Sequence, residues 1–480
     1  MNCVKIVRTV PLHIMKSADG MLDGFFKGPH NPSEMSYNEM LNKLYEMEFA
    51  HSWGWSREMR SLGHEVHDVC FGFDLIQEKW ADEHGLEKWE RNELTIVLRQ
   101  INYLKPDVLW LHSYAQMPYL IRLNLKEYFP FLKAIIAYAV DNTSYTQMKN
   151  FDLVLCDKDY TYNLAKKAGI NARILFNGFD ESILDRIEPI EFGHNARPYD
   201  FTFVGSSGFN LGNRYRKRYW TLLELAEKTS LKLWVFDRED PTVNANVNAE
   251  SDAFNYKDKI SDRVKAILTR QFIVTGLRRF IRVAFKMLNQ KTVIFVASFL
   301  DLRKYWHYWF FESINIVFLK KVNESNNNIL HNGPMLSRVE ADGKKLETPV
   351  LPVRALVPDS CYEPVFGIDM FRIWQRSKLT LNTYEDIGYE YPSNPRLFET
   401  TGVGSCLVVE YTPRIESIFQ VDREIVTYTS IDECLEKVNY LLDNDRERIE
   451  IAVAGQKRTL ESHNYKVRCE QLNEYLQEIL

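Results

Sequence analysis

Short runs of β-branched and other apolar residues, bounded by turn residues, alternate with helical stretches through most of the chain. In the first part of the chain, the runs predict strands at Val4–Val10, Glu65–Phe71, Val108–His112, Ala134–Ala139, Leu153–Cys156 and Ala172–Leu175. A helix around Gly54–Leu62 is expected to end at Gly63, a typical residue after a helix C-terminus. This alternation is typical of a parallel sheet with helices on both faces.

A second series of strands begins at Tyr199. It comprises Phe201–Val204, Leu231–Phe236, Leu379–Asn382, Cys406–Val409 and Ile425–Tyr428. Between the two series, the polar stretch Ile190–Pro198 is suited to a linker. We therefore predict two Rossmann-like, doubly wound α/β domains, residues 1–190 and 191–480. We also expect a cleft between them, because such sheets bind ligands beyond the carboxyl ends of their strands. The second domain is longer than its sheet requires, and the excess is a predicted insertion at residues 237–350.

The composition is that of an ordinary globular protein. The chain has 480 residues, of which 45% are apolar and 26% charged, which excludes a disordered, collagen-like or disulfide-stapled protein. Its seven cysteines are odd in number and scattered, so neither a disulfide framework nor a zinc site is indicated. Charged residues and Pro11 interrupt any apolar segment that a signal peptide would need. We expect a cytoplasmic location.

The most informative stretch runs from Ser393 to Thr412, with the sequence SNPRLFETTGVGSCLVVEYT. Asn394 is a good helix N-cap and Pro395 a good first helical residue, so a helix is expected to start here, with free backbone N–H groups that suit a pyrophosphate. Glu399 follows about one turn later, where its carboxylate could accept two hydrogen bonds from a ribose diol. The alternative is a capped surface helix with a solvated glutamate, and the pattern alone does not decide between them.

A second motif is Phe201–Gly208, FTFVGSSG, in which Gly205 and Ser206 follow the apolar residues of a predicted strand. A glycine-containing loop lets the backbone approach a ligand closely. The helix that is expected to follow supplies Arg214, Arg216, Lys217 and Arg218. Cations at this point would stabilise the negative charge of a bound phosphate group. Taken alone this signal is weak, because basic residues near a helix start are more often solvated.

Two further candidates come from the first series of strands. His112 is placed at the carboxyl end of the predicted strand Val108–His112, where it could hydrogen-bond a substrate hydroxyl. A packed or capping histidine is the open alternative. Asp141, after the strand Ala134–Ala139, is a weaker candidate.

The stretch from Ser393 onward resembles the C-terminal half of the spore-maturation-type (CgeB-like) glycosyltransferases. These are relatives of glycosyltransferase family 4 in the GT-B superfamily. The resemblance is carried by the R-x-F-E-x-x-x-x-G block that starts at Arg396, the Tyr-Thr-Pro turn at 411–413, an acidic helix near 431–442 and the Ala-Gly pair at 454–455. The N-terminal half is similar in a looser way, through WGWSREMRSLGHEVHDV, LKPDVLWLHSY and the segment from FDLVLCDKDY to ILFNGFDESIL.

The resemblance implies a GT-B fold and a nucleotide-sugar donor bound mainly by the C-terminal domain, with Glu399 on the ribose. The donor-binding residues that we predict are Gly205, Ser206, Arg214, Arg218, Asn394, Arg396, Leu397 and Glu399. Family 4 enzymes usually have a second Glu eight positions before the ribose-binding one. Here Tyr391 holds that position and Glu390 lies one residue out of register. Glu390 and His112 are the predicted catalytic residues, and the departure at Tyr391 leaves the stereochemistry open.

The predicted insertion is strongly basic, whereas the chain as a whole carries a net charge of −5. Between Arg263 and Phe310 it has ten Lys or Arg and one acid, which makes that segment +9 and the rest of the chain −14. The spacing predicts an amphipathic helix there, with Arg278, Arg282 and Lys286 on one face, and an aromatic cluster that includes Trp306 and Trp309 follows in the sequence. Such a segment could lie in an anionic membrane interface. It could also be a helical subdomain that packs on the second sheet.

The sequence therefore favours a glycosyltransferase that moves a sugar from a nucleotide-diphosphate donor to a glycan or lipid-linked acceptor. We expect no metal and no other cofactor, because helix dipoles and cations can take the place of a divalent ion. We expect no nucleic-acid partner, and the basic insertion favours peripheral membrane association slightly. The alternatives are a nucleotide-sugar 2-epimerase of the same fold and a non-catalytic membrane-surface or coat protein that keeps the fold.

Overall fold

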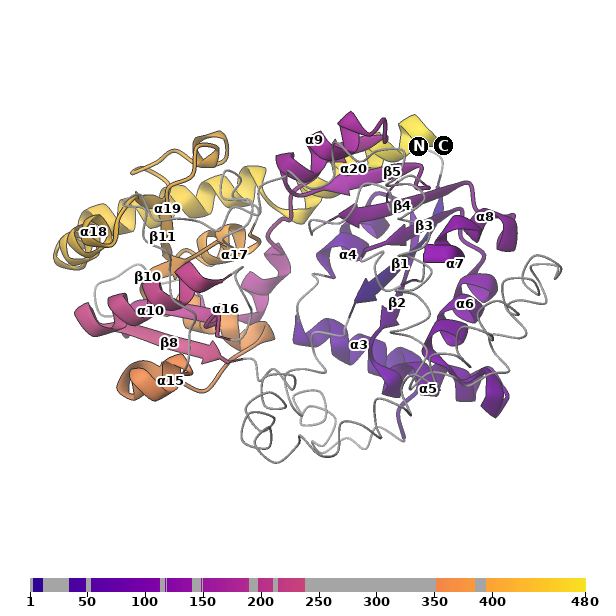
Figure 1. Cartoon of the computed structure of the whole chain (residues 1–480), viewed down its shortest axis with the longest axis horizontal. Coiled ribbons are helices and arrows are strands. Elements are labelled where there is room, and N and C mark those ends of the chain that lie inside the picture. The colour runs from indigo at the N-terminus through magenta and orange to yellow at the C-terminus, as the bar shows by residue number, and fades with distance from the viewer. Residues whose placement is uncertain are drawn as a thin grey trace, which may run out of the picture. The chain divides into compact units, whose positions relative to one another are not determined.

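The computed structural model describes residues 3–11, 34–48, 53–112, 117, 119–139, 148, 150–189, 197–209, 215–237, 351–384 and 394–480 (Figure 1). Several predictions lie outside these residues. They concern Asp141, Arg214, Glu390 and Tyr391, and nearly all of the insertion, including Arg278, Arg282, Lys286, Trp306 and Trp309. They stay predictions.

The first sheet is parallel and has six strands in the order β2-β1-β3-β4-β5-β6. The strands are β1 (Lys5–Pro11), β2 (Glu65–Phe71), β3 (Val108–Leu111), β4 (Ala134–Ala139), β5 (Leu153–Cys156) and β6 (Ala172–Ile174). All six predicted strands are confirmed, with ends that differ by one residue at most. The order reverses between β1 and β3, which makes their carboxyl ends the switch point of this sheet.

Helices cover both faces of the first sheet because alternate strand residues point to opposite faces and both sets are apolar. One face packs against α4 (Gly54–Ser61) and α20 (Tyr465–Ile479). The other packs against α6 (Glu93–Leu104), α8 (Leu125–Tyr128) and α9 (Asp159–Lys167). Further helices are α3 (Tyr37–Met47), α5 (Asp74–Glu83), α7 (Tyr119–Leu123) and the 3₁₀ turn η2 (Lys88–Glu90).

The second sheet is also parallel, with the order β12-β11-β10-β7-β8-β9. Its strands are β7 (Tyr199–Ser206), β8 (Leu231–Phe236), β9 (Cys361–Tyr362), β10 (Ser377–Asn382), β11 (Cys406–Glu410) and β12 (Val426–Tyr428). Numbered from its own first strand this is the order 3-2-1-4-5-6, with its switch point between β7 and β10. Two Rossmann-like α/β sheets confirm the predicted fold class. The sequence missed β9, because two residues are too short to give an apolar pattern.

The second sheet is likewise covered on both faces. One face packs against α10 (Arg216–Lys228), α15 (Val353–Leu356), α18 (Ile431–Asp443) and part of α19 (Asp445–Ser462). The other packs against α16 (Gly367–Gln375) and α17 (Arg396–Gly402). Three 3₁₀ turns complete the described elements: η5 (Glu181–Arg186), η8 (Pro358–Ser360) and η9 (Ile415–Ser417).

The chain runs from one sheet to the other twice, first between β6 and β7 and then between α19 and α20. These two crossing segments are hydrogen-bonded to each other. The Phe179 N–H donates to the His463 carbonyl at 2.8 Å, and the Tyr465 N–H donates to the Phe179 carbonyl at 3.0 Å. Gly178 permits this approach, because a Cβ there would lie 2.7 Å from the carbonyl carbon of Asn464. After the second crossing, α20 packs into the core of the first sheet. The division at residue 190 is a prediction that these contacts do not test.

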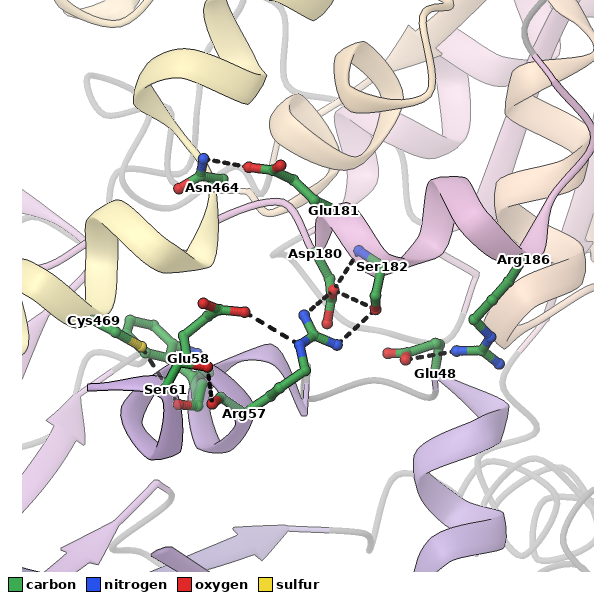
Figure 2. A network of polar contacts seen from close by, with 11 residues as sticks. Glu48, Arg57, Glu58, Ser61, Asp180, Glu181, Ser182, Arg186, Asn464 and Cys469 are labelled. Atoms are coloured by element: carbon green, nitrogen blue, oxygen red, sulfur yellow. Dashed lines mark hydrogen bonds and ion pairs between the residues drawn. The ribbon is translucent and has the colours of Figure 1, made fainter. Parts of the chain in front are cut away.

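A side chain of α4 and the residue that follows α3 hold the first crossing segment through polar contacts (Figure 2). Arg57 in α4 donates to Asp180 and, at 2.6 Å, to the Ser182 hydroxyl. Arg186 in η5 pairs at 2.7 Å with Glu48, the residue that follows α3. Burial, followed by the nearby Asp180 carboxylate, raises the pKa of Glu48 to about 7. The crossing is therefore held by buried or half-buried charges.

His463 connects the second crossing segment to both sheets. Its Nδ1 lies 2.8 Å from the Arg468 guanidinium, and its Nε2 lies 3.1 Å from the Ile418 carbonyl. Because arginine only donates, Nδ1 accepts and Nε2 carries the proton. Arg468 in turn donates to the Asn177 carbonyl at 3.2 Å. Burial, and then the charge of Arg468, lower the pKa of His463 to about 4, so the histidine is neutral in the folded protein.

We predict that this histidine makes the protein lose stability in mild acid. In the unfolded chain His463 takes up a proton below a pH of about 6.5, whereas in the folded protein it does so only below about 4. Its contribution to the free energy of unfolding is therefore complete above a pH of about 6.5 and is lost as the pH falls towards about 4. Between pH 7 and pH 5 the free energy of unfolding should fall by about 2 kcal/mol more in the wild type than in His463→Gln. Urea unfolding at the two pH values measures this, and parallel losses in the two proteins would contradict it.

Candidate functional site

The polar residues of interest gather at the carboxyl edge of the second sheet. β7 ends at Ser206, β10 at Asn382 and β11 at Glu410. β10 pairs with both other strands in parallel, so the three ends meet at one edge. The switch point between β7 and β10 lies on that edge, and open α/β sheets bind their ligands at such points.

Arg218 in the first turns of α10 spans this switch point. Its guanidinium donates to the Ser206 hydroxyl at 3.0 Å, to the Thr383 hydroxyl at 2.7 Å and to the Thr383 carbonyl at 3.2 Å. The ring of Tyr215 lies 4.5 Å from its Cζ. Hydroxyl and carbonyl oxygens from both sides of the switch point therefore orient one guanidinium. The structure brings together Ser206 and Arg218, which the sequence predicts as donor-binding residues.

A second cation on α10 is held at the end of the neighbouring strand. Lys217 pairs with Glu410, the last residue of β11, and Glu410 is only 5% exposed. Glu410 fixes the lysine in place, because a buried carboxylate without a partner would destabilise the fold by several kcal/mol. α10 begins at Arg216.

The glycine-containing loop after β7 is tied down by its own contacts. The Ser207 hydroxyl donates to Asp237 and accepts the Phe209 N–H at 3.1 Å. Gly208 has a φ of +90°, and a Cβ there would lie 2.6 Å from the Tyr215 carbonyl oxygen. Only glycine fits this position, for both reasons. The loop thereby brings the end of β7, with Gly205 and Ser206, close to the start of α10.

Asn394 links α17 to the same edge. Its Oδ1 accepts the Arg396 N–H at 2.9 Å, which makes its Nδ2 the donor to the Asn382 Oδ1 at 3.0 Å and to the Thr383 carbonyl at 3.4 Å. Asn394 thus caps the helix as the sequence predicts. The helix itself is assigned from Arg396, one residue later than expected, although Pro395 already has helical dihedral angles.

Glu399 lies on α17, close to this cap, and its carboxylate pairs with Arg396. The Glu399 side chain is 19% exposed and that of Arg396 is 33% exposed. The Arg396 Cζ lies 5.1 Å from the ring centroid of Trp374, which is buried. Leu397 is fully buried in the core and its N–H donates to the Asn394 carbonyl, so its side chain serves packing. The structure therefore joins Asn394, Arg396 and Glu399 to the ends of β7 and β10.

His112 belongs to the first sheet, at its own switch point. It directly follows β3, and its N–H donates to the Thr9 carbonyl of β1 at 3.3 Å. Its ring is parallel to that of Tyr138 with 5.1 Å between centroids, and it is 4% exposed. These contacts pack the histidine, and none of them connects it with the cluster around Arg218. Its predicted role stays a prediction.

Sequence reasoning missed four residues of this cluster: Trp374, Asn382, Thr383 and Glu410. Asn382 was recognised only as the end of a predicted strand, and Thr383 and Glu410 directly follow two predicted strands. The rule that ligands bind beyond the carboxyl ends of strands would have identified these three. Trp374 gives no such signal, because a buried tryptophan in an amphipathic helix looks like an ordinary core residue.

The described residues show neither a metal-binding group nor a membrane-spanning helix. They contain no group of three or more His, Cys, Asp or Glu side chains arranged to hold a metal ion. None of the helices in the described part of the chain is long and apolar enough to cross a membrane.

One segment of the chain matches a described protein family. Residues 355–474, about a quarter of the chain, match a family described as "Glycosyl transferase-like". This segment contains Thr383, Asn394, Arg396, Glu399 and Glu410, whereas Ser206 and Arg218 precede it. No curated protein matches the sequence.

The chain is also similar to several solved structures. HepE of Anabaena in complex with UDP-glucose has 9% identity and a TM-score of 0.48, over 99% of this chain and 100% of that one. Sucrose-phosphate synthase of Thermosynechococcus elongatus has 7% identity and a TM-score of 0.49, over 99% of both chains. A glycosyltransferase of Rickettsia africae has 9% identity and a TM-score of 0.48, over 100% of this chain and 99% of that one. The family match over residues 355–474 covers most of the polar cluster.

Proposed function

We propose that this protein is a glycosyltransferase that moves a sugar from a nucleoside-diphosphate sugar to a hydroxyl group of a glycan or lipid-linked acceptor. Two observations support the proposal. The segment 355–474 matches a glycosyl transferase-like family. The polar cluster lies at the switch point of the second sheet, where this class of fold binds its ligands.

The observation that carries the proposal is the position of Arg218. When the sugar leaves, the nucleoside diphosphate gains negative charge, and a preorganised cation stabilises that charge most effectively. Ser206 and Thr383 already orient the guanidinium before a ligand arrives, so little reorganisation is needed. Lys217 lies at the same edge, where its ion pair with Glu410 fixes the ammonium group but adds no net charge.

Glu399 is proposed to bind the ribose of the donor. A carboxylate can accept hydrogen bonds from the two hydroxyls of a ribose at once, and charged hydrogen bonds of this kind are strong. Asn394 and Arg396 connect Glu399 to Arg218 through a series of hydrogen bonds and one ion pair. The diphosphate is proposed to bind beside these two residues. Glu390 and His112 remain the proposed partners of the donor sugar and the acceptor hydroxyl. Retention of the anomeric configuration is proposed from the family resemblance alone.

The acceptor is proposed to be lipid-linked, with the basic insertion at the membrane surface. This part of the proposal rests on the residues Arg278, Arg282, Lys286, Trp306 and Trp309, whose charge and aromatic character suit an anionic interface.

A donor assay tests the proposed function. The purified chain is incubated with a panel of nucleotide sugars, with and without polyprenyl-linked acceptors in anionic vesicles. We expect release of a nucleoside diphosphate from at least one donor, faster with vesicles, and a glycosylated product that sediments with them. Release of no nucleoside diphosphate under any condition would contradict the glycosyltransferase assignment, and activity only on water-soluble acceptors would remove the lipid from it.

We predict that Glu399→Gln weakens binding of the donor by about 1–3 kcal/mol, because a charged acceptor of two ribose hydrogen bonds becomes neutral. Calorimetric titration with the donor that the panel identifies measures the change. Asp369→Asn is the matched control, since Asp369 forms the same kind of i,i+3 pair with Arg372 on α16. Equal affinity in the wild type and in Glu399→Gln would remove Glu399 from the site.

A further inference from the structure

The pairing of Arg396 with Glu399 conflicts with the role proposed for Glu399. A carboxylate that binds the two hydroxyls of a ribose side by side uses one oxygen for each, and each oxygen has two acceptor positions. In this structure Oε2 of Glu399 is taken by the Arg396 guanidinium. Arg396 fills one acceptor position of that oxygen and neutralises the carboxylate, so Glu399 binds a ribose more weakly while Arg396 stays paired with it.

The position of Arg396 is defined by more than the ion pair. Its Cζ lies 5.1 Å from the ring centroid of Trp374, within the range of a cation–π contact. Trp374 is fixed, because its side chain is 1% exposed in the core of the second sheet. The tryptophan ring thus supports the guanidinium on one side and the carboxylate binds it on another.

The backbone of Arg396 is held close to the proposed diphosphate position. Its N–H donates to the Asn394 Oδ1, and Asn394 in turn bonds the Thr383 carbonyl, which also accepts from Arg218. A long, flexible side chain that starts here has a second anion within reach whenever a diphosphate lies near Arg218. Arginine binds phosphate oxygens in the same forked geometry in which it binds a carboxylate.

We propose that Arg396 is an exchangeable counter-ion, paired with Glu399 in the free protein and transferred to the diphosphate of the donor when it binds. This inference rests on the proposed function and adds a rule of selection to it. The diphosphate removes Arg396 from Glu399 and so frees the carboxylate for the ribose. A nucleoside without phosphates must compete with Arg396 for the same oxygen. The site thereby selects ligands that carry both a ribose and a diphosphate.

The test compares the four common ribonucleosides with their 5′-diphosphates in calorimetric titrations of the wild type and Arg396→Gln. In the variant, the affinity for the nucleoside should rise about two- to fivefold, the modest gain expected when a partly exposed ion pair is removed. The affinity for the diphosphate should fall about tenfold or more, because a charged phosphate contact is lost. The two ligands thus respond in opposite directions, which a purely structural role of Arg396 would not produce.

Two further variants complete the test. Arg372→Gln removes the arginine of a similar i,i+3 pair on α16 and should leave both affinities unchanged. Arg396→Lys keeps the charge, so it should restore most of the diphosphate affinity. Thermal unfolding of each variant confirms that the fold is intact.

Each outcome bears on one of the two claims. Opposite shifts in Arg396→Gln support the exchange. Equal losses of affinity for both ligands, or no change in either affinity, would overturn the exchange. The proposed function would still stand in that case, provided that the wild type binds the diphosphate. A wild type that binds no ribonucleoside diphosphate would overturn the proposed function and the exchange with it.

Discussion

The contact on which the account of the site depends is the one between Arg218 and the two strand ends at the switch point of the second sheet. β7 and β10 are neighbours in the sheet, but more than 170 residues separate them along the chain. Their next connections run to opposite sides, which leaves a crevice at their carboxyl ends in folds of this kind. Arg218 bonds Ser206 at one strand end and Thr383 at the other, so it connects the two strand ends and brings a positive charge to the switch point. Asn394 adds α17 to the same arrangement through Thr383.

The crossing segments impose a second constraint, which ties the two sheets into one unit of the chain. Phe179 bonds both flanks of Asn464, and its ring packs so tightly against Gly402 that a Cβ on that glycine would lie 2.4 Å from it. Gly402 ends α17, the helix that carries Arg396 and Glu399. The crossing is thus in direct contact with an element of the proposed donor site. Neutral His463 holds the same region through its bonds to Arg468 and Ile418. The half-buried Arg57 and Arg186 hold it through their bonds to Ser182 and Glu48 (Figure 2).

Much of the fold could be predicted because parallel strands are buried on both faces and appear in the sequence as short apolar runs. Glycines and asparagines with strict backbone roles gave the ends of elements, as Gly63 and Asn394 illustrate. The pairing of strands far apart in sequence, such as β7 with β10, leaves no local signal. Thr383 and Glu410 directly follow predicted strands, so their place at the carboxyl edge could be predicted. Their bonds to Arg218 and Lys217 could not, because these contacts join residues far apart in the chain. Leu397 shows the opposite difficulty, since a residue inside a recognised motif turns out to serve the core.

The central claim is that the cluster around Arg218 binds the diphosphate of a nucleotide sugar. The most direct measurement is a calorimetric titration of ribonucleoside diphosphates into the wild type and Arg218→Gln, with Lys228→Gln at the exposed end of α10 as control. Arg218→Gln should bind at least about tenfold more weakly, because a preorganised charged contact is lost, while the control should bind like the wild type. Wild-type affinity in a folded Arg218→Gln protein would contradict it.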